Sequence, residues 1–231
     1  MRFVHGLGIM AGVLALSLTA HAASLAPPQL AVSAAQADQR ASCNFTAFVQ
    51  ETDPAGLNVR QAPGVSAKVL GHLPPVWRNR EMGVFPVRIE VEVVAAQGGW
   101  FQIQHARDNP DLTGLPARKV FTGKGWVSGA KLVVKSQASK AYALPSAKSA
   151  VVVQLSDGTF DSDGWVGAGQ LLACSGHWAL VEWSRDTLSP EGQELIQPGS
   201  GQGKPPARFR GWVNQLCGLQ ESSCGGLAGQ D

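Results

Sequence analysis

The chain contains an internal repeat, and this repeat limits the possible folds more than any other feature of the sequence. Pro63 aligns with Pro145, Trp100 aligns with Trp178, and a Gly-Trp-Val stretch occurs in both halves. The similar segments lie in the same order in both halves: 57–73 with 141–155, 93–103 with 171–181, and 125–127 with 211–213. Such self-similarity indicates two copies of one structural unit.

Each copy has the pattern of a small β unit. Short apolar runs separated by turn residues predict strands in the first copy at 45–49, 68–73, 88–95, 100–105 and 126–132. Short antiparallel strands bury an apolar face best by curling into a partly open five-stranded barrel. We therefore predict an all-β protein with this organisation: a first domain at 43–134, a linker at 135–140, a divergent second domain at 141–218 and a tail at 219–231. Long insertions precede the closing strand of each domain, and the second of them spans 184–208.

Four stretches of the first copy resemble the bacterial SH3 domain family. They are Gly-Leu-Asn-Val-Arg-Gln-Ala-Pro at 56–63, Lys-Val-Leu-Gly at 68–71, Gly-Trp-Phe-Gln-Ile at 99–103 and Gly-Trp-Val at 125–127. The second copy departs from the pattern, because Ala-Tyr-Ala at 141–143 stands where the family has Asn-Val-Arg. Most of the mature chain is similar to tandem exported SH3 domain-containing proteins of proteobacteria.

This resemblance implies two SH3-like barrels and a role outside the cytoplasm. Members of the family often target cell-wall hydrolases to the wall, and some bind cell-wall peptides. We see no hydrolase domain in this sequence, so any catalytic partner is expected to be a separate chain. The expected function is that of an exported, non-enzymatic binding or adaptor protein that recognises peptidoglycan or an envelope protein.

The N-terminus has the features of a secretory signal peptide at 1–22. Arg2 supplies a positive charge, residues 6–18 are apolar, and Ala20-His21-Ala22 has the small residues that signal peptidase reads. An uncleaved membrane anchor is the alternative. We expect a flexible leader at 23–42 and a mature protein in the periplasm or secreted, with no transmembrane segment.

Four cysteines in an exported chain predict two disulfides. The preferred pairing is Cys217 with Cys224, which leaves Cys43 for Cys174 and requires the two barrels to pack together. Cys174 with Cys217 is the alternative. A zinc site made by the cysteines other than Cys43, together with His177, is a third reading of these residues.

Charge and motif content indicate neither nucleic-acid binding nor catalysis. The formal net charge is +2, and basic residues alternate with acidic ones instead of forming a patch. We find no catalytic motif, and we expect no cofactor and no metal. Two alternatives remain: a Cys174–His177 pair in a small cell-wall or peptide hydrolase, and a calcium site at Asp157, Asp161 and Asp163.

Four residues are the candidate ligand contacts. Trp77 and Arg78 lie in a stretch that the sequence predicts to be an irregular insertion. An aromatic side chain in such a segment is a candidate for an exposed ligand contact. Asn58 and Arg60 follow the first turn, and they either hold that loop or contact the ligand directly. The tryptophans that follow glycines or precede strands are expected to pack in the barrels; they are Trp100, Trp126, Trp178 and Trp212.

Overall fold

The computed structural model describes residues 39–78, 86–199, 203, 205–220 and 224. Strands predominate and the helices are short, so the prediction of an all-β protein is confirmed. The expected signal peptide at 1–22 and most of the expected leader lie outside the described residues. Ala41 and Ser42, which we assigned to the leader, instead open the first strand by pairing with Ala96 and Ala95.

Among its described residues, the first half contains nine strands. They are β1 (Ala41–Val49), β2 (Leu57–Arg60), β3 (Val69–Leu73), β4 (Trp77–Arg78), β5 (Pro86–Val87), β6 (Glu90–Gln97), β7 (Trp100–Arg107), β8 (Gly125–Ser128) and β9 (Leu132–Val133). Helix α2 (Pro110–Thr113) follows β7, and the 3-10 turn η1 (Gly129–Lys131) separates β8 from β9. The single strand predicted at 126–132 is therefore wrong, because η1 takes the chain from a pairing with β7 to a pairing with β1.

The described part of the second half contains six strands. They are β10 (Lys140–Tyr142), β11 (Val151–Leu155), β12 (Gly169–Ser175), β13 (Trp178–Ser184), β14 (Ile196–Pro198) and β15 (Arg208–Val213). Its helical elements are α3 (Asp163–Ala168), the 3-10 turn η2 (Arg185–Thr187) and α4 (Pro190–Glu194). The long insertion before β15 thus folds into η2, α4 and β14, and β14 pairs with β11.

The repeat in the sequence appears as a repeat in strand order. Five strands of the first sheet lie in the order β3-β2-β8-β7-β6, and five strands of the second lie in the order β11-β10-β15-β13-β12. The register repeats as well, since Trp126 lies opposite Gln102 on β7 and Trp212 lies opposite Leu180 on β13. The first sheet then adds β1 and β9 beside β6, whereas the second adds β14 beside β11.

Alternating side chains explain why these segments form half-buried strands. On β7, Phe101 and Ile103 are fully buried, whereas Gln102 and Gln104 between them are only partly buried. Successive side chains of a strand point to opposite faces, so this pattern turns one apolar face toward the interior.

The two halves share one continuous hydrophobic core. At their boundary the start of β1 lies against β12: the Asn44 N–H donates to the Gly176 carbonyl (2.8 Å), and the Gly176 N–H donates to the Ser42 carbonyl (2.9 Å). Gly129 lies so close to the Leu171 carbonyl and the Phe101 ring that a side chain there would collide with both. The halves are therefore packed together, not loosely tethered.

Residues 135–140, which we expected to be a linker, are packed against the end of the second half. Lys135 and Ser136 are buried. The Cys217 N–H donates to the Lys135 carbonyl (2.9 Å), and the Ser136 hydroxyl donates to the Asn214 carbonyl (2.6 Å). The segment joins two sheets, but it does so as ordered structure.

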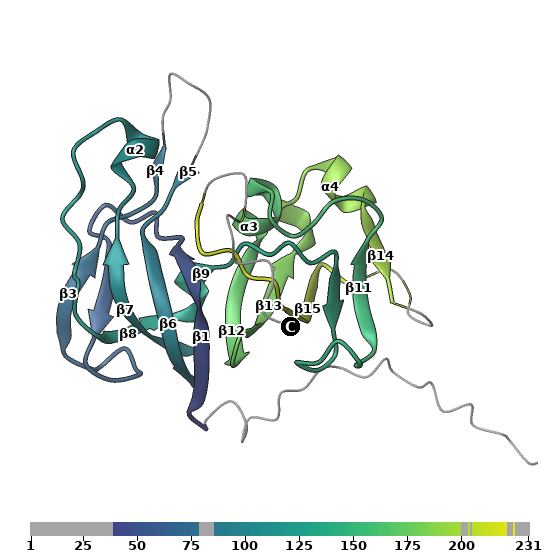
Figure 1. The fold of residues 1–231 in the computed structure, drawn as a ribbon, viewed down its shortest axis with the longest axis horizontal. Coiled ribbons are helices and arrows are strands. Elements are labelled where there is room, and N and C mark those ends of the chain that lie inside the picture. The colour runs from purple at the N-terminus through teal and green to yellow at the C-terminus, as the bar shows by residue number, and fades with distance from the viewer. Residues whose placement is uncertain (1–38, 79–85, 200–202, 204, 221–223, 225–231) are drawn as a thin grey trace, which may run out of the picture.

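The two ends of the molecule differ in what their connections contain. Helices α2, α3 and α4 and the β4–β5 hairpin lie at one end, which we call the upper end (Figure 1). The lower end is made by the connections 61–68, 98–99, 143–150 and 176–177. Strands β3 and β11 each run from a lower-end connection toward the upper end.

Candidate functional site

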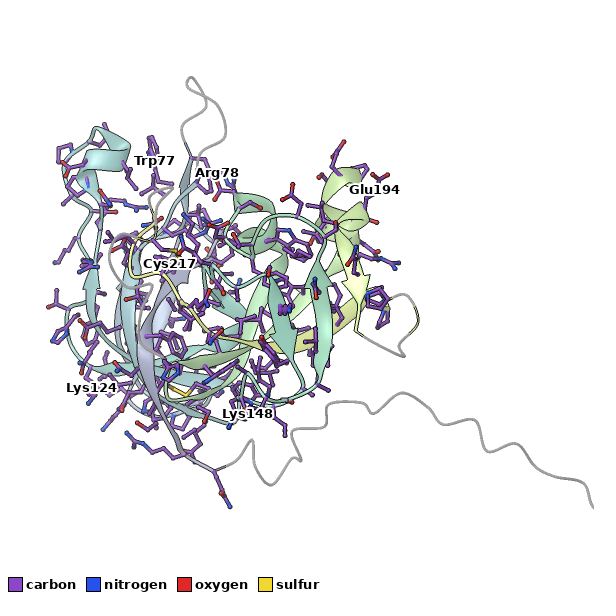
Figure 2. The ribbon with its side chains drawn as sticks, turned by 45° about the vertical axis from the view of Figure 1, so that its right-hand side comes forward. Trp77, Arg78, Lys124, Lys148, Glu194 and Cys217 are labelled. Atoms are coloured by element: carbon purple, nitrogen blue, oxygen red, sulfur yellow. A yellow bond between two sulfur atoms is a disulfide. The ribbon has the colours of Figure 1, made fainter. Side chains whose placement is uncertain are left out.

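The β4–β5 hairpin carries two of the predicted contacts, Trp77 and Arg78. The sequence suggested an irregular insertion, but Trp77 pairs with Val87 and Arg78 pairs with Pro86 in a two-stranded sheet. Trp77 is partly buried and Arg78 is exposed. The two side chains point to opposite sides of β4, with Trp77 on the side of α2 and Arg78 on the side of α3 (Figure 2). This alternation follows from their being consecutive residues of a strand.

A partly buried ion pair fixes the base of the hairpin. The Arg118 guanidinium pairs with Asp108 (2.5 Å), and it also donates to the Pro75 carbonyl (2.7 Å). Burial by itself would raise the pKa of Asp108, but the hydrogen bonds from Arg118 lower it below its ordinary value. On the other side, the Val76 N–H donates to the Glu51 carbonyl (2.8 Å). Trp77 is thus held at its position by both neighbouring connections.

Arg88 lies behind the hairpin and connects the two halves. Its side chain is nearly fully buried. It donates to the Gln50 carboxamide oxygen (2.6 Å) and pairs with Asp163 at the start of α3 (3.4 Å). Burial lowers the pKa of Arg88, the Asp163 carboxylate acts in the opposite direction, and the positive charge of Arg78 lowers the pKa further. Arg78 therefore lies close enough to Arg88 to interact with it electrostatically.

The chain segment after β15 also reaches this region. The Arg88 N–H donates to the Gln220 side-chain oxygen (2.6 Å), and the Gln220 amide donates to the Arg88 carbonyl (2.5 Å). The same amide donates to Glu90 (3.3 Å), and the Lys135 ammonium donates to the Gln220 carbonyl (3.1 Å). Gln220 thus pairs with the backbone of Arg88 as a neighbouring strand would.

Asn58 and Arg60 lie apart from the hairpin. Arg60 lies opposite Val69, where β3 begins, whereas Trp77 follows the other end of β3. The Arg60 guanidinium donates to the Ala67 carbonyl (2.8 Å), which is the loop-holding contact that the sequence offered as one of two roles. Asn58 lies opposite His72 on β3. The structure therefore groups Trp77 with Arg78 and does not bring Asn58 and Arg60 to them.

All four cysteines are in disulfides, with the preferred pairing. Cys43 is bonded to Cys174 (Cα–Cα 5.7 Å), and Cys217 is bonded to Cys224 (Cα–Cα 4.7 Å). The cysteines are therefore not zinc ligands in this structure, and Cys174 has no free thiol to act with His177.

The three aspartates proposed as a calcium site have separate partners. Asp157 accepts from the Gly158 N–H, Asp161 accepts from the Thr159 hydroxyl, and Asp163 pairs with Arg88. Among the residues that the structure describes, no group of three or more histidine, cysteine or carboxylate side chains has an arrangement suited to a metal ion.

Arg88 and Gln220 were not identified from the sequence, and Asp163 was named there only as a candidate calcium ligand, not as the partner of Arg88. Arg88 alone gave a signal, because it is the one charged residue in the otherwise apolar run 84–89, and a basic residue must find a partner when it is buried. Gln220 lies 132 residues from Arg88 in the sequence, and nothing local marks it.

Comparisons with known proteins give no relative for this chain. No protein-family model, no curated protein and no solved structure matches it significantly. Within the described ranges, none of the helices combines the length and the apolar character that crossing a membrane requires.

Proposed function

We propose that this protein is an exported binding or adaptor protein of the cell envelope, without enzymatic activity, that recognises peptidoglycan or a protein partner. Its contact surface is the upper end, centred on Trp77 and Arg78. The proposal includes two SH3-like barrels, 43–134 and 141–218, as the scaffold.

The arrangement around the β4–β5 hairpin is the observation that most supports this function. A tryptophan and an exposed arginine project from a hairpin whose base is fixed by Arg118 and Glu51. Aromatic and arginine side chains dominate the binding energy of many protein surfaces, particularly where they are held in place before binding. Asp163 of the second half lies next to this surface through Arg88, so a ligand at the hairpin would contact both halves.

Two further observations support the scaffold and the location. The shared order of five strands in both sheets agrees with tandem copies of one barrel. Two disulfides agree with an oxidising compartment such as the periplasm or the exterior. The alternative, a small hydrolase, gains no support from the bonded Cys174.

Sedimentation with purified sacculi tests the peptidoglycan form of the proposal. We expect the wild-type protein to pellet with sacculi, and Trp77→Ala to lower the affinity about tenfold. Arg78→Gln is expected to weaken binding. The remaining binding should depend less on salt concentration than the binding of wild type, because one positive charge has been removed. Lys140→Gln is the charge-matched control for Arg78→Gln, because Lys140 is an exposed basic residue on β10 of the second half.

The protein-partner form has its own test. If the wild-type protein stays in the supernatant, cross-linking in intact cells followed by mass spectrometry should identify one partner that Trp77→Ala loses and Lys140→Gln retains. If neither sacculi nor any partner depends on Trp77, the upper end is not the binding surface. Cell-wall lysis in a zymogram by the purified protein would overturn the non-enzymatic assignment.

A further inference from the structure

The charges of this protein are unevenly distributed between its two ends. Every described Asp and Glu outside the strands lies in an upper-end connection or helix: Glu51, Asp53, Asp108, Asp111, Asp157, Asp161, Asp163, Asp186, Glu191 and Glu194. The connections 61–68, 98–99, 143–150 and 176–177 are fully described and contain no carboxylate side chain. The lower end therefore presents basic groups without neutralising partners in its own loops.

Two hairpins of the lower end expose an aliphatic side chain next to a lysine. In the β2–β3 hairpin, Val65 is 78% exposed and Lys68 is exposed. In the β10–β11 hairpin, Leu144 is 62% exposed and Lys148 is exposed. Lys124 is also exposed, and Figure 2 places it with Lys148 in the lower part of the molecule.

The recurrence of this pattern is what distinguishes it from ordinary surface variation. A single exposed aliphatic residue is normal on a soluble protein. Here the equivalent hairpin of each half carries one, and the shared strand order directs both hairpins to the same end. A flat surface could therefore meet both tips at once.

Both hairpins are ordered by their own hydrogen bonds. In the first, the Ala67 N–H donates to the Gly64 carbonyl (3.2 Å), and Arg60 donates to the Ala67 carbonyl. In the second, the Leu144 N–H donates to the Ser149 hydroxyl (3.0 Å). Tips that are already ordered lose little conformational entropy when they bind.

We propose that the lower end docks on an anionic phospholipid bilayer. Val65 and Leu144 enter the headgroup region, and Lys68, Lys124 and Lys148 contact the lipid phosphates. Exposed aliphatic residues flanked by lysines and free of carboxylates are the combination that peripheral membrane binding uses. The upper end, with its carboxylates and Trp77, then faces away from the bilayer.

Vesicle sedimentation tests this directly. The exported protein is mixed with vesicles of phosphatidylglycerol and phosphatidylethanolamine, and separately with vesicles of phosphatidylcholine. We expect partition into the anionic vesicles that weakens as salt is raised, and little partition into phosphatidylcholine. Lys148→Gln should lower the partition coefficient about fivefold. Leu144→Ser should lower it about tenfold.

Two upper-end variants serve as matched controls. Leu115→Ser removes an aliphatic side chain that is 52% exposed in the α2 connection, and it should leave partition unchanged. Glu194→Gln changes the net charge by the same amount as Lys148→Gln, with the opposite sign, at the other end of the molecule (Figure 2). Circular dichroism of each variant verifies that the fold is retained.

The outcomes separate this proposal from the proposed function. Loss of vesicle binding in Leu144→Ser with normal binding in Trp77→Ala supports lower-end docking. Equal binding of wild type, Leu144→Ser and Lys148→Gln overturns it. If wild type does not bind the anionic vesicles and the lower-end variants lose binding to sacculi, the lower end recognises the cell wall. The assignment to a bilayer is then wrong.

Discussion

The first and second halves share five strands in one order, but they surround the closing tryptophan differently. In the first half, Trp126 lies opposite Arg60 and Gln102 on the neighbouring strands. The Arg40 guanidinium also lies over the Trp126 ring, 5.4 Å from its centre. Trp126 is therefore buried beneath long polar side chains, whose stems cover the ring while their polar ends face water.

In the second half the corresponding neighbours are apolar. Trp212 lies opposite Tyr142 and Leu180, and it belongs to a small hydrophobic cluster with Leu180 and Trp178. Tyr142 meets Trp178 edge to face, with ring centres 5.7 Å apart. Tyr142 occupies the place that Arg60 has in the first half, so the sequence difference between the two copies at this position coincides with a change from polar to apolar neighbours of the tryptophan.

The interiors differ in the same direction. The first half is filled mainly by aliphatic residues such as Val59, Ile103 and Val127. The second contains stacked and edge-to-face rings of Phe160, Trp165, Trp183 and Phe209. The comparison teaches that one topology accepts two kinds of packing, because strand order depends on the pattern of buried positions more than on which apolar residues fill them.

The largest effect is expected from the disulfide that joins the halves. Cys43 and Cys174 are separated by 131 residues. Closing so long a loop reduces the entropy of the unfolded chain, and we expect the double variant Cys43→Ser, Cys174→Ser to lose about 5 kcal/mol of unfolding free energy. Urea denaturation followed by tryptophan fluorescence measures this loss.

The tail disulfide provides the control for that experiment. Cys217 and Cys224 close a loop of only seven residues in separation, so Cys217→Ser, Cys224→Ser should lose about 2 kcal/mol. Equal losses in the two double variants would contradict the chain-entropy argument. Two separate unfolding transitions in the first variant would show that the halves are stable domains that the bridge holds together.

Truncating the closing tryptophans is the next largest change. Trp126→Ala and Trp212→Ala should each lose about 3–5 kcal/mol, with Trp212→Ala near the upper value because its neighbours are all apolar. Differential scanning calorimetry of both variants makes the comparison. Trp77→Ala should lose less than about 1 kcal/mol, since this side chain is only partly buried. A larger loss of stability in Trp77→Ala than in Trp126→Ala or Trp212→Ala would contradict the assignment of Trp77 to ligand contact and of the other two to packing.

Acid should weaken the second half through Glu182. This buried carboxylate pairs with Arg210 (2.6 Å) and accepts from Gln170 (2.8 Å). Burial alone would raise the pKa of Glu182, but the hydrogen bond and charge of Arg210 bring it below its ordinary value of 4.5. A lowered pKa in the folded state stabilises the protein above the unfolded pKa, and this stabilisation is lost as the pH falls through the folded value.

Glu182→Gln is therefore expected to lose about 2 kcal/mol at neutral pH and progressively less below about pH 4. Urea denaturation of wild type and variant at both pH values gives the difference. The position equivalent to Glu182 in the first half is Gln104, which donates to Glu92 (3.2 Å). Gln104→Glu would place two carboxylates together, so its stability relative to wild type should rise as the pH falls. A pH-independent loss in Glu182→Gln would show that shape, and not charge, is what this position requires.

The smallest effect is expected at Arg40. Replacing it with Gln removes the contact with the Trp126 ring and the hydrogen bond to Gln102 (2.7 Å). Because the guanidinium is exposed, the loss should be about 0.5–1 kcal/mol. Arg40→Lys should retain part of the interaction with the ring. Repeated thermal denaturation of both variants and wild type measures this small difference. No change in either variant would show that the contact of Arg40 with Trp126 does not stabilise the protein.

The repeat and most of its strands follow from the sequence alone, whereas the order of the strands in each sheet came from the structure. Alternating residues such as Phe101 and Ile103 are local signals, because each strand needs only its own pattern to select a buried face. The Gly-Trp-Val segments marked the closing strands β8 and β15 for the same reason. The preferred cysteine pairing also came from sequence, since Cys217 and Cys224 are close along the chain.

The contacts between the halves were decided only by the tertiary structure. Arg88 meets Asp163 and Gln220 from 75 and 132 residues away, and the packing of two sheets determines which residues become neighbours. Arg60 and Trp77 lie apart for a different reason, because Arg60 pairs with the start of β3 and Trp77 follows its other end. A local pattern can fix which way a side chain faces within its strand, but it holds no information about which distant strand will lie across from it, and that is why the upper end had to be seen in three dimensions.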